Sequence, residues 1–353
     1  MLPWNKKTFL KIKDALSKYT KRAYFVGGCV RDIYFGKKSN DFDIEIYDVS
    51  PEQMEEIAKE LKALGVGKSF FVYKKYNYDL ALARTEKKVG NLHTDFQVTV
   101  ENDEYKGSLR RDFCMNAIMI NIFNQKILDL HGGIDDCKNK KIRIVNYETF
   151  CEDSLRVLRF IQFIARFKLK TNKNDLNYLK NIDITNLSND RISAELIKLF
   201  NAKYPEIGLY YLYKLELFET CFGFKVDKKT FLSVLIKIKN NKNLICKEKR
   251  FALFFYYFIN YFNNFYNKLQ FKKKLAFLKT EPKLKKISDY ELCKVATKMP
   301  LKEWLGLNKE IIIRAKTLGL YDKKLKIIYE NIKSKNDANM CEDLHIKEYL
   351  KNV

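Results

Sequence analysis

One short run, residues 41–47, most constrains what this chain can fold into. Acidic and apolar side chains begin in alternation along it, which predicts a strand with one polar face. Asp41 and Asp43 therefore point the same way, and two carboxylates on one face can hold one or two Mg²⁺ ions with triphosphate oxygens. Glu45 continues this face. It could be a third ligand, but we expect it to face solvent, and an ordinary solvated strand would show the same alternation.

A pair of glycines precedes this strand. Gly27 and Gly28 follow a short apolar run and are followed by Arg31 and Asp32. Because glycine has no Cβ, the pair allows backbone N–H groups to approach phosphate closely, or it simply forms a tight turn. Arg31 offers a guanidinium fork to phosphate oxygens, unless Asp32 neutralises it in a structural pair. With the two aspartates, these groups predict a metal-bound nucleoside triphosphate and nucleotidyl transfer.

The pattern of predicted elements changes near residue 145. Before it we expect helices at 7–18 and 51–64 and strands at 24–26, 41–47, 70–73, 79–83, 96–100, 115–122 and 126–129. The second helix should begin with Ser50 at its N-cap and Pro51 at its first position. From residue 150 onward the periodicity is helical almost to the end. The sequence therefore predicts an α+β protein, with a small mixed-sheet head followed by an all-helical remainder.

Charge narrows the class of partner. The chain has 67 Lys and Arg against 43 Asp and Glu, a formal net charge of +24. This balance favours a polyanion such as RNA or DNA, or an anionic membrane surface, although compositional drift towards Lys would also raise it. No run approaches 18 uncharged apolar residues, and the eight cysteines form no CxxC pair. The N-terminus lacks the apolar core of a signal peptide, so we expect a cytoplasmic protein that does not span a membrane.

Four further motifs follow the glycine pair and the two aspartates. They are RRDFCMNA at 110–117, DLHGGIDD at 129–136, EDSLRVLRF at 152–160 and DRISAE at 190–195. In this order the five segments resemble motifs A to E of the class II tRNA nucleotidyltransferases and bacterial poly(A) polymerases. The resemblance covers about residues 23 to 200. It implies a catalytic head at 1–145, a helical neck with a base-selection helix at 146–205, and a tRNA-binding body and tail at 206–353.

The resemblance also implies roles for motif B, the segment 110–117. Arg110 and Arg111 are expected to contact the triphosphate. Asp112 and Asn116 are expected to contact the sugar or to shape the site. Arg31 of motif A would join them on the nucleotide.

Motif D, the segment 152–160, carries the predicted base readers. If it is helical, at about 100° per residue, Glu152, Asp153, Arg156 and Arg159 share roughly a third of the circumference and would bind the nucleotide. An Asp can accept from the exocyclic amine that C and A share, while an Arg donates to a ring nitrogen or carbonyl. Asp153 and Arg156 are therefore the expected readers, with Glu152 orienting Arg156. The resemblance implies that this edge replaces a nucleic-acid template, whereas a salt-bridged surface helix is the ordinary alternative.

A strand and a loop of the head complete the candidate site. Asp79 and Arg84 match an acidic residue and an arginine five apart in the family and are candidate accessory residues. The loop at 86–96, which contains His93, could adjust the pocket between C and A addition, or it could be a plain connection. The chain has three histidines and no His-Asp dipeptide, so we do not expect the metal phosphohydrolase domain that some relatives append.

The resemblance implies a tRNA nucleotidyltransferase that completes the 3′-terminal CCA from CTP and ATP, with Mg²⁺ held by Asp41 and Asp43. The basic helical part would bind tRNA through its shape and phosphates. Two related activities stay open, namely a poly(A) polymerase and an enzyme restricted to CC or A addition. A catalytically inactive RNA-binding protein is the alternative from another class. The oligomeric state is not predicted.

Overall fold

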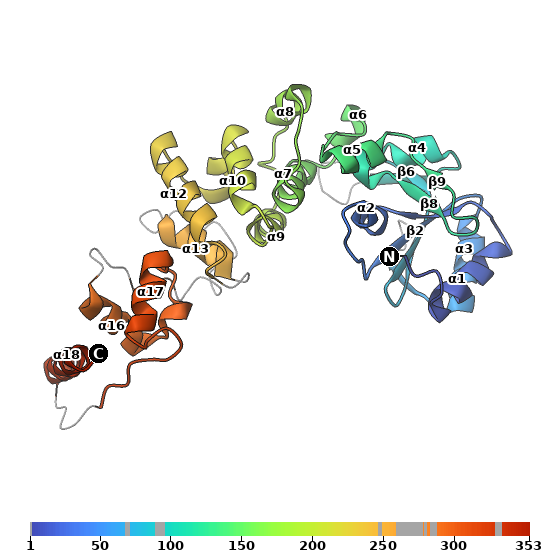
Figure 1. The fold of residues 1–353 in the computed structure, drawn as a ribbon. Helices are drawn as coiled ribbons and strands as arrows, with labels where there is room; N and C mark the ends of the chain where they lie inside the picture. Colours follow the sequence, from blue (N-terminus) through green and yellow to red (C-terminus); the bar gives the residue numbers. More distant parts are fainter. Residues whose placement is uncertain are drawn as a thin grey trace. The chain divides into compact units, whose positions relative to one another are not determined.

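The computed structural model describes residues 2–67, 71–88, 96–245, 249–258, 278, 281–282, 288–328 and 334–353. The chain forms two compact units, Met1–Leu187 and Ser188–Val353 (Figure 1). The first contains a mixed sheet with helices. In the second, the regular elements among the described residues are all helices. This confirms the expected α+β class, while the predicted boundaries at 145 and 205 stay predictions.

A seven-stranded sheet forms the centre of the first unit, in the order β3-β4-β5-β2-β1-β8-β9. Its strands are β1 Ala23–Val26, β2 Phe42–Ile46, β3 Leu64–Gly67, β4 Val72–Lys75, β5 Tyr78–Leu82, β8 Met119–Asn121 and β9 Ile127–Leu128. Strand β2 is central, since it pairs antiparallel with β1 and parallel with β5. A separate two-stranded sheet joins β6 Arg84–Lys88 to β7 Phe96–Val100.

The alternation along β2 has the predicted effect on its apolar side. Phe42, Ile44 and Ile46 are buried, and the Phe42 ring packs edge-on against Phe25 of β1 with centroids 6.1 Å apart. Phe25 in turn stacks on Phe9 of the first helix at 5.2 Å. The apolar side of the strand therefore lies in the core, and the polar side is left for the site.

Eight α-helices and one 3₁₀ turn are described in the first unit. They are α1 Lys7–Ser17, α2 Gly28–Tyr34, α3 Pro51–Leu61, α4 Glu104–Ser108, the 3₁₀ turn η2 Cys114–Asn116, α5 Gly133–Asn139, α6 Tyr147–Phe150, α7 Leu155–Phe167 and α8 Lys173–Lys180. Helix α1 packs beside α3 (Figure 1). Helix α3 begins with the expected cap: Ser50 Oγ accepts from Gln53 N, and the Gln53 side chain accepts from Ser50 N.

Three predicted elements differ from the structure. Helix α3 ends at Leu61 because Lys62 adopts a left-handed conformation, so the predicted extension to 64 is wrong and Leu64 begins β3. The strand expected at 115–122 is shortened to β8, since 114–116 form η2. The strand expected at 70–73 lies further along the chain, since β4 begins at Val72 and ends at Lys75, while 68–70 lie outside the described residues.

The second unit packs around aromatic and aliphatic side chains. Its described elements are α9 Asn189–Phe200, α10 Pro205–Lys214, α11 Phe218–Phe222, α12 Lys228–Asn241, α13 Arg250–Tyr257, α16 Asp289–Lys298, η6 Leu301–Glu303, α17 Lys309–Thr317 and α18 Lys335–Lys351. Phe200, Phe222 and Phe254 are buried together, with the ring centroids of Phe222 and Phe254 4.7 Å apart. Among the described residues, no helix has both the length and the apolar character that a membrane crossing requires.

Candidate active site

Three carboxylates gather on the polar side of the central strands. The parallel pairing of β2 with β5 sets Asp43 directly opposite Asp79, and Asp41 immediately precedes β2. Burial raises the pKa of Asp43 above its ordinary value; Asp79 and Asp41 raise it further, while Arg111 opposes the change. The structure therefore brings together the two predicted metal ligands and one of the two accessory residues.

Backbone from motif A closes one side of this carboxylate group. Gly27 has φ 69° and ψ −133°, a conformation that side chains on L-residues rarely allow. A Cβ at Gly27 would lie 3.2 Å from Asp43 Oδ2 and 3.6 Å from Arg111 Nη1. A Cβ at Gly28 would lie 3.5 Å from Arg31 Nη2. The glycine pair thus forms the tight turn between β1 and α2 and also lets the backbone approach the carboxylates.

The residues at this position fit a divalent cation. Carboxylate oxygens are the ligands that Mg²⁺ and similar hard cations prefer. Asp79 Oδ1 is buried and makes no hydrogen bond, although Lys74 Nζ lies 3.2 Å away without hydrogen-bonding geometry. A cation would also relieve the repulsion that raises the pKa of Asp43. Over the described ranges, no three His, Cys, Asp or Glu side chains are already arranged as a metal cluster.

The expectation that Glu45 faces solvent is wrong. The residue is 1% exposed. Arg110 Nη2 donates to its Oε2 at 2.5 Å, Arg111 Nη2 donates to the same oxygen, and the Tyr47 hydroxyl donates to Oε1 at 2.7 Å. Burial alone would raise the pKa of Glu45, but Arg111 and Arg110 lower it to about 2. Glu45 is therefore an anchor for the motif B arginines.

Arg111 interacts with two carboxylates at once. Its Nη2 is bonded to Glu45, and its Nη1 lies at the corner formed by Gly27 and Asp43. Burial lowers the pKa of Arg111, but Glu45 and Asp43 outweigh it and raise the pKa overall. A phosphate oxygen bound beside the aspartates would therefore lie near the Arg111 guanidinium.

Arg31 forms the structural pair with Asp32 that was the alternative to a phosphate contact. Its Nε and Nη2 donate to Asp32 Oδ1 at 2.9 and 2.7 Å, and its Nη1 donates to Asn116 Oδ1 at 2.8 Å. The guanidinium lies over the Phe163 ring, 4.8 Å from its centroid. Arg31 is 5% exposed, so its phosphate contact stays a prediction.

Asp112 and Asn116 connect motif B to helix α7. Asn116 Nδ2 donates to Asp112 Oδ1 at 2.7 Å, and Arg159 donates to Asp112 Oδ2 through Nε at 2.9 Å and Nη2 at 2.7 Å. Burial would raise the pKa of Asp112, but Arg159 and the other donors hold it below its ordinary value. Arg166 of α7 also donates to Asp32 at 3.0 Å. Motifs A, B and D are thus joined by one polar network.

Motif D differs from its predicted form. Helix α7 begins at Leu155, so Glu152 and Asp153 precede the helix, and the expected shared helical edge from 152 is wrong. The reason is local: Asp153 Oδ1 accepts from Leu155 N at 3.2 Å, which is a turn contact. Arg156 does lie on α7, where it donates to the carbonyls of Thr149 and Arg110, both at 2.7 Å. The base-reading roles stay predictions.

The two predicted accessory residues lie in different sheets. Arg84 begins β6, in the two-stranded sheet, whereas Asp79 lies on β5 of the central sheet. The loop expected at 86–96 is wrong at both ends, because β6 continues to Lys88 and β7 begins at Phe96, and residues 89–95, including His93, lie outside the described residues.

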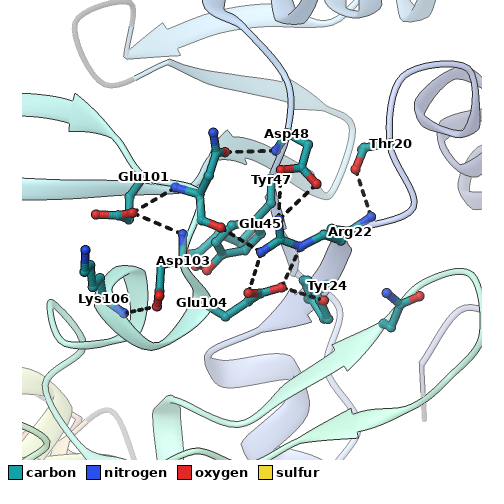
Figure 2. A network of polar contacts seen from close by, with 12 residues as sticks. Thr20, Arg22, Tyr24, Glu45, Tyr47, Asp48, Glu101, Asp103, Glu104 and Lys106 are labelled. Carbon is teal, nitrogen blue, oxygen red and sulfur yellow. Dashed lines mark hydrogen bonds and ion pairs between the residues drawn. The ribbon is translucent and has the colours of Figure 1, made fainter.

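Sequence reasoning missed a set of residues next to the site. Arg22 donates to Glu104 at 2.9 and 2.5 Å and to Asp48 at 2.8 and 3.0 Å (Figure 2). Its guanidinium lies over the Tyr47 ring, 5.4 Å from the centroid. Tyr47 could have been found, since it continues the alternation of β2 on the same side as Glu45. No sequence signal pairs Arg22 with Glu104.

Two family models match the chain. Residues 23–143 match the poly A polymerase head domain, and residues 179–222 match a probable RNA and SrmB-binding site of polymerase A. The CCA-adding enzyme of Bacillus pumilus is 29% identical over 62% of this chain and 56% of its own length. The multifunctional CCA protein of Xylella fastidiosa is 36% identical over 41% of this chain and 35% of its own length. The chain therefore spans about half the length of these relatives or less.

Solved structures share the fold. The Bacillus stearothermophilus CCA-adding enzyme in complex with CTP has a TM-score of 0.69 at 20% identity, covering 100% of this chain and 94% of its own. The Thermotoga maritima CCA-adding enzyme complexed with tRNA has a TM-score of 0.64 at 19% identity, covering 96% and 94%. The head-domain match at residues 23–143, the ordered motifs and the carboxylate geometry therefore make this chain similar to the CCA-adding enzymes and poly(A) polymerases.

Proposed function

We propose that this chain is a template-independent RNA nucleotidyltransferase that completes the 3′-terminal CCA of tRNA from CTP and ATP. The observation that carries the proposal is the corner formed by Asp43, Asp79, Gly27 and Arg111, where carboxylates for a cation and a guanidinium for phosphate lie together. The relatives named CCA-adding enzymes support this choice of acceptor. The net charge of +24 supports an RNA partner.

Enzymes of this family use a divalent metal, which we propose to be Mg²⁺ held by Asp41 and Asp43, with Asp79 as an accessory group. When bound, Mg²⁺ lowers the pKa of an attacking hydroxyl and neutralises charge on the leaving pyrophosphate. The chain's own residues hold the reactants so that the RNA 3′-hydroxyl attacks the α-phosphate in line. Catalysis of this kind is mainly positioning and charge stabilisation.

The arginines of motif B supply positive charge at this corner. Arg110 and Arg111 both pair with Glu45, which places two guanidinium groups next to each other at this corner. Their side chains are only 15% and 18% exposed, and charges act more strongly where water is excluded. Arg111 is the better placed of the two, because its Nη1 lies beside Asp43.

Base selection is assigned to the turn before α7 and to the start of that helix. We propose that Asp153 and Arg156 read the base, with Glu152 orienting Arg156. Arg156 donates to the Thr149 and Arg110 carbonyls, so reading a base would require it to exchange at least one of these bonds. That exchange would couple base arrival to the backbone of motif B.

The test incubates the purified chain with tRNA lacking its CCA end, with CTP, ATP or both, and with Mg²⁺ or EDTA. We expect C, C and A to be added and then no more, and no addition in EDTA. Asp43→Asn should abolish incorporation but retain tRNA binding in a gel-shift assay. Asp14→Asn, which removes an exposed carboxylate on α1, should leave both unchanged.

Other products would select the alternatives. A long A tail would identify a poly(A) polymerase, and addition of C alone or A alone would identify a partial enzyme. Retained tRNA binding without any incorporation by the wild-type chain would identify an inactive RNA-binding protein. Full incorporation by Asp43→Asn would contradict the assignment of the metal ligands.

A further inference from the structure

Tyr47 follows strand β2 on the side that carries Asp43 and Glu45. Its backbone N–H donates to the Arg22 carbonyl at 2.9 Å, which continues the pairing of β2 with the chain before β1. The side chain is completely buried. The Tyr24 ring meets it edge-on with centroids 5.7 Å apart. Tyr47 is therefore held by its backbone and by the ring contacts with Tyr24 and Arg22 (Figure 2).

The Tyr47 hydroxyl occupies a closed position. A Cβ added to Gly107 of α4 would lie only 2.9 Å from this oxygen, so α4 backbone blocks its movement on that side. On the other side the hydroxyl donates to Glu45 Oε1 at 2.7 Å. Because it is confined in this way, the hydroxyl fixes the orientation of the Glu45 carboxylate.

The two oxygens of Glu45 have different partners as a result. Oε1 accepts from Tyr47, and Oε2 accepts from both Arg110 and Arg111. If the hydroxyl were removed, Oε1 would be a buried charged oxygen that had lost its donor, which is unfavourable. The Arg110 and Arg111 guanidinium groups already donate to the other oxygen of this carboxylate, so they are donors that can turn towards Oε1. Arg111 would then leave the corner that it shares with Gly27 and Asp43.

We propose that Tyr47 is a positioning residue for the nucleoside triphosphate: through Glu45, it holds the Arg111 guanidinium beside Asp43, where the triphosphate binds. The inference rests on the proposed function, because it takes this corner as the triphosphate site. Tyr47 itself does not contact the nucleotide in this scheme. Its effect should therefore disappear when Glu45 is altered.

The test compares Tyr47→Phe with Tyr24→Phe. Each change removes one hydroxyl from the same ring pair, but the Tyr24 hydroxyl donates to Glu104, at 2.9 Å, and not to Glu45. We expect Tyr47→Phe to weaken CTP binding and to raise the KM for CTP and ATP roughly tenfold, with a smaller change in kcat. Tyr24→Phe should leave KM within about twofold of wild type. Melting temperatures of both variants report any purely structural loss.

A double-mutant cycle with Glu45→Gln decides whether Tyr47 acts through Glu45. Once Glu45→Gln has raised KM, the added Tyr47→Phe change should raise it no further, because residues acting as one unit are not additive. Fully additive effects, or equal KM values for Tyr47→Phe and Tyr24→Phe, would overturn the proposal. If Tyr47→Phe fails to fold, Glu45→Gln alone must raise KM, and an unchanged KM would also overturn it.

Direct CTP binding by calorimetry, in the presence of Mg²⁺, separates this inference from the proposed function. A wild-type chain that binds CTP but never extends tRNA would refute the proposed function, while weaker CTP binding by Tyr47→Phe would still support the positioning role. Normal tRNA extension by the wild type, with unchanged CTP binding by Tyr47→Phe, would refute the positioning role alone.

Discussion

Replacing Gly27 with alanine tests how closely the backbone must approach the carboxylate site. The substitution places a methyl group 3.2 Å from Asp43 Oδ2 and 3.6 Å from Arg111 Nη1. The backbone of Asp43 is fixed, because β2 is paired on both sides, with β1 and β5, so the side chain must absorb the contact. The carboxylate must therefore shift by a few tenths of an ångström, away from the position that would hold the cation.

Two separate costs follow from this geometry. Alanine at φ 69° and ψ −133° carries backbone strain of about 1–3 kcal/mol, which lowers the free energy of unfolding. The shift of Asp43 acts on the rate instead. A misplacement of about 1 Å can cost about a hundredfold in rate, so a shift of a few tenths should slow incorporation by at least several-fold and roughly tenfold at most.

Gly36→Ala is the matched control. Gly36 also has a positive φ, 63°, but no atom lies within 4 Å of its added Cβ. Both variants should lose stability in urea unfolding, and only Gly27→Ala should slow single-turnover incorporation of CTP. A full rate for Gly27→Ala, or an equal slowing by Gly36→Ala, would refute the reasoning.

Two further predictions concern the surroundings of the site. Gly107→Ala should lower the free energy of unfolding by about 1–3 kcal/mol through overpacking, and by less in a Tyr47→Phe background, because the atom that it meets is gone; equal losses in urea unfolding would contradict this. Asp112→Asn should cost about 1–2 kcal/mol at pH 7, at the low end because its partner Arg159 is 36% exposed. The pKa of Asp112 is lowered in the folded chain, so this stabilisation is present above the ordinary value of 3.8 and is lost as pH falls below it. Urea unfolding from pH 7 to pH 3 checks this, and a difference between variant and wild type that is as large at pH 3 as at pH 7 would contradict it.

Elements whose signals are local were predicted from the sequence. The cap of α3 depends on Ser50 and on the residues directly after it, and the structure contains it as expected. Strand β3 was missed because Leu64–Gly67 contains two glycines and lies at the sheet edge, where Leu64 and Val66 are exposed and show no alternation of burial. Part of the turn η2 was predicted as strand because its apolar residues fit the period of a helix and that of a strand equally well.

The site residues divide in the same way: features with a local sequence signal were predicted, and features that depend on long-range pairing were not. The alternation correctly placed Asp43 and Glu45 on one side of β2. That Asp79 lies opposite Asp43 depends on a parallel pairing across thirty-odd intervening residues, which no local pattern encodes. The start of α7 at Leu155 depends on a side-chain contact of Asp153, which a periodicity argument does not include.

Glu45 shows why identifying a residue is not enough to assign its role. On an exposed strand face its carboxylate would be a candidate ligand, but motif B and α4 cover this part of β2, and the covered carboxylate must be paired with cations. The arginines that pair with it are the ones expected on the triphosphate. The two roles are compatible for Arg111, because Nη2 is bonded to Glu45 while Nη1 lies beside Asp43. In the proposed scheme a triphosphate engages Nη1 without breaking the bond that positions the guanidinium, and the burial of Glu45 would then serve to orient positive charge towards the nucleotide.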